Sequence, residues 1–158
     1  MEPRGGIGVE QAVANLVYAY AERIDAGDFA GVADLLAHAE VTTEGMAGVT
    51  RGRDDVLALY QRTTRLHEET GTPRTHHVTT NLAIELGPGG DAASARSKYT
   101  VFQQTPKLPL QPIIAGRYHD RFERVGGAWR FCARHIFCDH FGDLSQHLLF
   151  DAAAIPRN

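Results

Sequence analysis

Apolar residues recur near the start of the chain at the spacing of an amphipathic helix. Between residues 9 and 25 they follow the pattern i, i+3, i+4, i+7, at Val13, Leu16, Val17, Tyr20 and Ile24. This spacing places one apolar stripe along one side of a helix. Gly27 predicts the end of that helix, and Asp28 is a suitable N-cap for a second helix that extends to Leu36. A third helix is expected over residues 53–69, because two aspartates in its first turn favour the helix dipole.

The pattern changes after Pro73. Four segments rich in β-branched and apolar residues predict long strands: residues 74–86, 92–104, 113–125 and 129–141. Glycine-rich turns at 87–90 and 126–127 and a proline-marked loop at 106–112 separate them, and residues 40–44 predict a shorter strand. Helices followed by long hairpins predict an α+β fold, in which a cone-shaped, curved, mostly antiparallel sheet wraps around the N-terminal helices. The mouth of such a cone can enclose a pocket for a small molecule.

Length and composition indicate one globular domain. The 158 residues, of which 43% are hydrophobic and 22% charged, fit a single folded unit. We expect this domain over residues 8–142, with a flexible N-terminus at 1–7 and a C-terminal tail at 143–158. The net charge of −3 leaves no basic surplus for binding phosphates, so a nucleic-acid partner is not expected. No apolar stretch approaches the roughly 18 residues that span a bilayer, so a membrane partner is not expected either.

Cysteine and histidine spacing bears on compartment and cofactors. Cys132 and Cys138 lie six residues apart in the last predicted strand, which would place them on one face but about 20 Å apart, too far for a disulfide. Residues 1–8 lack the apolar core of a signal peptide, so we expect a reduced, cytoplasmic protein. The eight histidines form no HxH or HExxH motif and no CxxC is present, so neither a metal nor a cofactor is expected.

Four motifs carry a resemblance to a known family. They are Tyr20-x-x-x-x-Asp25-x-Gly27-Asp28-Phe29, Gly52-Arg53-Asp54, Thr75-His76-His77-Val78-Thr79-Thr80-Asn81, and Gly116 to Arg124 together with Gly127-Ala128-Trp129-Arg130-Phe131. Together they resemble the SnoaL-like branch of the nuclear-transport-factor-two-like superfamily over residues 8–142. That superfamily includes dehydratases, isomerases, polyketide cyclases, a dehydrochlorinase and non-catalytic binding modules, so the resemblance implies the fold more directly than an activity.

The resemblance implies a catalytic pair. Asp25 and His77 fall on the motif positions of the His–Asp dyad in scytalone dehydratase, bile-acid 7α-dehydratase and hexachlorocyclohexane dehydrochlorinase. In such a dyad the histidine removes a proton, while the carboxylate fixes its tautomer and stabilises the imidazolium. The alternative is that Asp25 is a solvated carboxylate at a helix end and His77 a polar residue on an exposed sheet face. His76 competes with His77, because neighbouring strand residues face opposite ways; we favour His77 on the pattern His77-x-x-x-Asn81.

Further candidates surround this pair. Tyr20 stands five residues before Asp25, as in the bile-acid dehydratase, where the phenol assists; alternatively it only completes the buried helix stripe. Arg134 occupies a strand position near the arginine of the dehydrochlorinase-like enzymes, which implies a cation for a developing anion, although a surface arginine would explain it too. His76, Tyr118 and His135 are candidate substrate-binding residues whose orientation the sequence leaves open.

The sequence therefore predicts a cofactor-independent lyase or isomerase. We expect a dehydratase-like enzyme that acts on a small cyclic, partly apolar substrate. A non-catalytic module of the same fold that binds a small ligand or a partner, and a polyketide cyclase or hydrolase with the same pocket, remain alternatives. Because the outer face of the sheet needs a cover, we also expect a homodimer or higher homo-oligomer.

Overall fold

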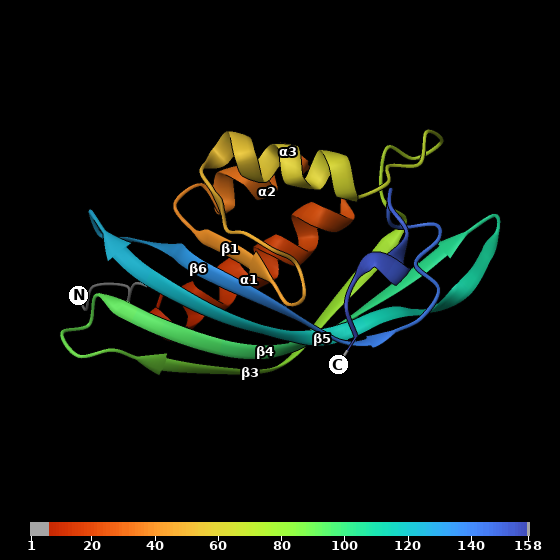
Figure 1. The fold of residues 1–158 in the computed structure, drawn as a ribbon. Helices are drawn as coiled ribbons and strands as arrows, with labels where there is room; N and C mark the ends of the chain where they lie inside the picture. The colour runs from red at the N-terminus through yellow and green to blue at the C-terminus, as the bar shows by residue number, and fades with distance from the viewer. Residues whose placement is uncertain (1–6, 158) are drawn as a thin grey trace, which may run out of the picture.

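Three helices lie on one face of a curved, open sheet (Figure 1). The computed structural model describes residues 7–157, so most of the predicted flexible N-terminus lies outside the described residues. The helices are α1 (Val9–Asp25), α2 (Phe29–Leu35) and α3 (Arg53–Thr63). The strands are β1 (Glu40–Thr43), β2 (Thr50–Arg51), β3 (Thr75–Leu86), β4 (Ala92–Thr105), β5 (Leu108–Val125) and β6 (Ala128–Phe141). The predicted α+β class is confirmed.

The sheet has the strand order β2-β1-β6-β5-β4-β3. All neighbouring strands are antiparallel except β1 and β6, which run parallel. Two long hairpins, β3–β4 and β5–β6, are joined by the β4–β5 turn, so most of the sheet is a continuous meander. Its concave inner face holds the hydrophobic core.

The stripe of α1 packs onto that inner face as its spacing predicts. Val13, Val17, Tyr20 and Ile24 are buried on the helix, and Leu16 is partly buried against the same core. The sheet contributes alternate residues of β4, β5 and β6, among them Val101, Phe122 and Phe131. This alternation is expected of strands with one buried face.

Two boundaries differ from the sequence prediction by more than one residue. The third helix ends at Thr63 rather than at residue 69, because Thr64 and His67 instead form β-bridges with Leu148 and Thr72. Strand β5 begins at Leu108, inside the predicted proline-marked loop. There Thr105 pairs with Leu108 across a short turn, and the strand register shifts around the prolines. Tertiary pairing therefore decided both boundaries.

Bulges overturn two strand-facing predictions. An extra residue in β6 opposite Arg121 and Phe122 moves Cys132 out of alternation. Cys138 lines a cavity on the inner face while Cys132 borders a hollow on the other face, so the two free cysteines do not share a face. In β3 the register shifts between Thr80 and Ala83, and Asn81 adopts a φ of 53° and is exposed. Asn81 therefore does not share the inner face with His77.

The C-terminal segment closes one end of the core. Residues 142–157 lie beside the end of α3 and over the inner face of the sheet (Figure 1), and they include a 3-10 turn, Ala152–Ala154. Backbone hydrogen bonds join it to the residues that follow α3, from Arg65 N to His147 O (2.8 Å) and from Leu149 N to Thr63 O (3.0 Å). Within residues 7–157, no helix has the length and apolar character needed to cross a membrane.

Candidate active site

Asp25 and His77 meet where the end of α1 lies against the start of β3. The Nδ1–H of His77 donates to Oδ1 of Asp25 at 2.6 Å, and the backbone N–H of His77 donates to Oδ2 at 2.8 Å. The hydroxyl of Thr75 donates to Oδ1 at 2.7 Å. Because the carboxylate can only accept, the proton of the neutral His77 ring sits on Nδ1 and leaves Nε2 as an acceptor.

These hydrogen bonds explain a carboxylate at an unfavourable place. Asp25 is the last residue of α1, where the helix dipole disfavours a negative charge. Burial by itself would raise the pKa of Asp25, but the hydrogen bonds and charge of His77, with the hydrogen bond from Thr75, outweigh burial and lower that pKa. Asp25 is therefore ionised at neutral pH and available to stabilise a cation on His77.

His77 lines a cavity of about 150 Å³ on the inner face of the sheet. Nine of the lining residues are apolar: Met46, Leu59, Val101, Ile114, Ile136, Leu144, Leu148, Phe150 and Ile155. The others are four tyrosines, two histidines, two threonines and a cysteine: Tyr20, Tyr60, Tyr99, Tyr118, His77, His147, Thr43, Thr63 and Cys138. A larger hollow of about 450 Å³ on the outer face contains neither Asp25 nor His77.

The tyrosine hydroxyls form a second polar group in the cavity. The hydroxyls of Tyr20 and Tyr60 are 2.8 Å apart, and the ring of Tyr20 packs edge-on against those of His77 and Tyr118. Burial raises the pKa of Tyr20, Tyr60 and Tyr118, and the nearby charge of Arg134 offsets this only in part. All three phenols therefore stay protonated and can donate hydrogen bonds.

The absence of a side chain at Gly116 leaves room for the hydroxyl of Tyr99, the fourth tyrosine of the cavity. The hydroxyl of Tyr99 donates to the carbonyl of Phe137 on β6 at 2.8 Å, passing over the neighbouring strand β5 at Gly116. A Cβ at position 116 would collide with that carbonyl and with the Tyr99 hydroxyl. The ring of Tyr99 in turn stacks on Tyr118, with centroids 4.4 Å apart.

Arg134 lies behind this tyrosine layer rather than in the cavity wall. Its side chain is fully buried and makes a bidentate ion pair with Asp120, with both N···O distances 2.8 Å. The guanidinium lies 4.2 Å from the Tyr20 ring centroid and 4.1 Å from that of Tyr118. A guanidinium on an aromatic face is attracted by the ring quadrupole, so Arg134 fixes the two cavity tyrosines from beneath.

The remaining candidates from the sequence divide between the two faces. Tyr20 and Tyr118 line the cavity with His77. His76 is exposed and is not among the lining residues. His135 points to the outer face, where its Nδ1 lies 2.5 Å from the hydroxyl of Thr42. The structure thus brings Asp25, His77, Tyr20 and Tyr118 together and leaves His76 and His135 apart from them.

Sequence reasoning missed two tyrosines and one histidine of the cavity wall. Tyr60 lies in the predicted third helix, where no motif distinguishes it from a core residue. Tyr99 lies in a predicted strand with no motif around it. His147 lies in the tail, where no periodicity indicates which way a side chain points. Only the alternation of β4 could have identified one of them, Tyr99, as inward-facing.

His147 is a second deeply buried histidine of the site. Its exposed fraction is 9%, and its Nδ1 has no hydrogen-bond partner among residues 7–157. Burial, followed by repulsion from His77 and His67 whenever these carry a proton, lowers the pKa of His147 to about 4, although the charge of Asp25 opposes this. His147 is therefore neutral at neutral pH.

We expect His147 to make the protein less stable as the pH falls. Between pH 6.5 and 4 the unfolded chain binds a proton that the folded chain excludes. The contribution of His147 to the free energy of unfolding is therefore fully present above pH 6.5. It is lost as the pH falls to 4, and the loss is on the order of 3 kcal/mol. Urea unfolding at pH 7, 6 and 5 measures the loss. The variant His147→Phe, which retains Asp25, His67 and His77, should show a flatter pH dependence; an equal slope in both proteins would contradict the assignment.

No metal centre is evident in the part of the chain that the structure describes. Among residues 7–157, no group of three or more histidine, cysteine, aspartate or glutamate side chains is placed to hold a metal ion. The titratable side chains that line the cavity are those of His77, which contacts Asp25, and of His147, Cys138 and the four tyrosines.

Comparisons with known proteins agree with this fold. A model of the SnoaL-like domain matches residues 8–135. An NTF2-like protein with a cystatin-like fold from Novosphingobium aromaticivorans is 21% identical, with 91% of this chain and 84% of that chain covered and a TM-score of 0.66. A candidate scytalone dehydratase from the same organism is 23% identical, with 84% and 85% covered and a TM-score of 0.65.

A protein of unknown function from Mycobacterium tuberculosis is 24% identical, with 91% of this chain and 80% of that chain covered and a TM-score of 0.66. No curated protein matches the sequence. At these identities the solved structures establish a shared fold and leave the activity open.

Proposed function

The chain belongs to the SnoaL-like domain family, and on that premise we propose that it is a cofactor-independent lyase or isomerase of the dehydratase type. The observation that carries the proposal is the 2.6 Å contact between His77 and Asp25 at the wall of a cavity whose lining residues are half apolar. A charged acid–base pair in such surroundings contributes nothing obvious to the hydrophobic core, but it is suited to moving a proton.

In the proposed mechanism, Nε2 of His77 removes a proton from a carbon next to an electron-withdrawing group. The imidazolium that forms is stabilised by Asp25, which stays ionised at neutral pH. One hydroxyl of the Tyr20–Tyr60 pair donates to the other, and the second donates its own proton to the negative charge that develops on the substrate. The cation then returns its proton to a leaving hydroxide, which gives a dehydration, or to another carbon, which gives an isomerisation.

The substrate class follows from the cavity. Its lining is half apolar and half polar, and the polar groups gather around His77 and the tyrosines. A small cyclic, partly apolar molecule satisfies both kinds of surface. The neighbour whose name refers to scytalone dehydratase is consistent with this class of reaction.

A panel of hydroxylated cyclic ketones tests the proposal. We expect at least one to lose water, detected by mass, or to isomerise, detected by its ultraviolet spectrum. We expect the rate to be unchanged after dialysis against EDTA, because the proposed chemistry uses only side chains. No turnover of any member, combined with tight binding of some, would favour the alternative of a non-catalytic binding module.

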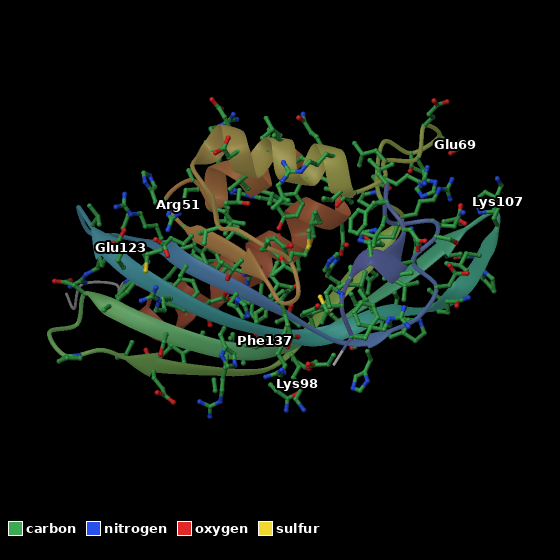
Figure 2. The ribbon with its side chains drawn as sticks, viewed as in Figure 1. Arg51, Glu69, Lys98, Lys107, Glu123 and Phe137 are labelled. Carbon is green, nitrogen blue, oxygen red and sulfur yellow. The ribbon has the colours of Figure 1, made fainter. Side chains whose placement is uncertain are left out.

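We further propose a homodimer formed through the outer face of the sheet. There the ring of Phe137 contacts those of His119 and His135 and lies 4.2 Å beneath the guanidinium of Arg117, which pairs with Asp139. Figure 2 shows Phe137 and Lys98 on the side of the sheet away from the helices. A patch that carries an aromatic ring beside a cation and an anion can be complementary to its own two-fold copy.

Light scattering at micromolar concentration should give the mass of a dimer. The variant Phe137→Asp should shift it toward the monomer, whereas Glu69→Arg, on the side of the helices, should leave it unchanged (Figure 2). A monomeric wild-type protein would contradict the proposed interface.

A further inference from the structure

The C-terminal segment supplies a cavity histidine that the proposed mechanism does not use. His147 lines the same cavity as His77, and its Nδ1 is buried without a hydrogen-bond partner among residues 7–157. A buried polar atom without a partner lowers stability, so folding alone does not account for a histidine here. Such atoms in a cavity wall are suited to bind a ligand.

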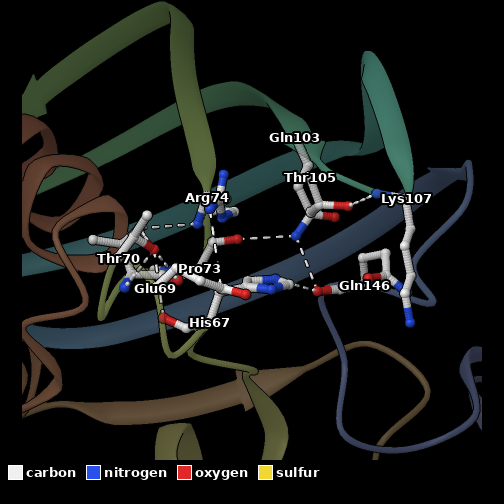
Figure 3. A network of polar contacts seen from close by, with 10 residues as sticks. His67, Glu69, Thr70, Pro73, Arg74, Gln103, Thr105, Lys107 and Gln146 are labelled. Carbon is white, nitrogen blue, oxygen red and sulfur yellow. Dashed lines mark hydrogen bonds and ion pairs between the residues drawn. The ribbon is translucent and has the colours of Figure 1, made fainter.

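Neighbouring polar groups fix the backbone of His147. The carbonyl of Gln146 accepts a hydrogen bond from Nε2 of Gln103 at 3.0 Å and lies 3.0 Å from Nε2 of His67 (Figure 3). On the other side, the backbone N–H of Arg65 donates to the carbonyl of His147. The position of the ring is thus set by its flanking backbone, and neither of its nitrogens is held by a hydrogen bond to residues 7–157.

The neutral ring offers one donor and one acceptor to the cavity. Burial favours this neutral form, as does repulsion by His77 and His67 whenever they carry a proton, whereas Asp25 opposes it. A hydroxyl group matches such a ring, because it can both donate and accept a hydrogen bond. The volume of about 150 Å³ limits what carries this hydroxyl, since a cavity of that size holds a single six-membered ring.

We propose that His147 is a substrate-binding residue that hydrogen-bonds the hydroxyl group of a monocyclic substrate. That this hydrogen bond orients the substrate toward His77 rests on the proposed function. Recognition of the hydroxyl group by His147 does not depend on that function. The C-terminal segment then determines specificity as well as covering the core.

Phenol and toluene test this with probes of equal heavy-atom number. Their dissociation constants are measured on the full chain, as wild type and as His147→Phe. We expect the ratio of the toluene constant to the phenol constant to fall at least about fivefold in the variant, because one hydrogen bond is lost. In the wild type labelled with ¹⁵N-histidine, phenol but not toluene should shift the ring resonances of His147.

The control is His77→Ala, which removes the other cavity histidine and should leave the ratio within about twofold. An unchanged ratio in His147→Phe, a collapse only in His77→Ala, or no saturable phenol binding would each overturn the proposal. Should His147→Phe fail to fold by circular dichroism, His147→Leu and the resonance shifts decide. Because none of these measurements uses turnover, an inactive ketone panel would refute the proposed function without affecting this result.

Discussion

Replacing His77 by alanine should lower turnover at least about a hundredfold while leaving the fold intact. Positioned proton transfer typically contributes two to four orders of magnitude to a rate, and His77 is the histidine that Asp25 orients at the cavity wall. The measurement is kcat on whichever ketone of the panel reacts, with circular dichroism and urea unfolding as checks of folding.

Asp25→Asn should also be strongly impaired, by at least about tenfold, because a neutral amide cannot stabilise the imidazolium and can reverse the tautomer of His77. Asparagine has nearly the same shape as aspartate and can still accept a hydrogen bond from Thr75. The loss of the negative charge is therefore the main effect of this substitution.

His76→Ala is the matched control, one residue away on the same strand. His76 is exposed and does not line the cavity, so its loss should change kcat little. If His76→Ala abolishes turnover and His77→Ala does not, the assignment of the base is wrong. If neither variant changes the rate, the dyad is wrong and the binding-module alternative gains support.

Replacing Arg134 by methionine should lower the free energy of unfolding by about 3–5 kcal/mol, because the variant leaves a buried charge without its partner. The Asp120 side chain is 1% exposed, and both of its oxygens are paired with Arg134. The variant also removes the cation beneath the rings of Tyr20 and Tyr118. Urea unfolding at pH 7 measures the change.

The double variant Arg134→Met with Asp120→Leu separates charge from packing. Replacing both partners of a buried ion pair by apolar residues is often close to neutral, so we expect it to be more stable than Arg134→Met alone. A double variant as unstable as the single one would show that packing, not the unpaired charge, is responsible. Normal stability of Arg134→Met with a collapse of turnover would instead favour substrate contact, as the family resemblance implies.

Local sequence patterns predicted much of the fold because the corresponding interactions are local. The apolar stripe of α1 and the stop at Gly27 gave bounds of 9–25 that agree with the structure. The glycine turns at 87–90 and 126–127 located both long hairpins. Patterns failed where a distant segment competes for the backbone, as at the end of α3, where Thr64 bridges to Leu148.

The sequence by itself determined the α+β class, the inward stripe of α1 and, through the motif resemblance, the pairing of Asp25 with His77. Only the tertiary structure decided the rest of the cavity. Bulges in β3 and β6 changed which residues face inward, and alternation alone cannot locate a bulge. The burial of Arg134 depends on Asp120 across the β5–β6 ladder. The place of His147 depends on the hydrogen bond from Gln103 to the preceding carbonyl, that of Gln146, and on the bond from Arg65 to its own carbonyl. Such contacts join residues far apart in the sequence, so they are set by packing and leave no periodic signal.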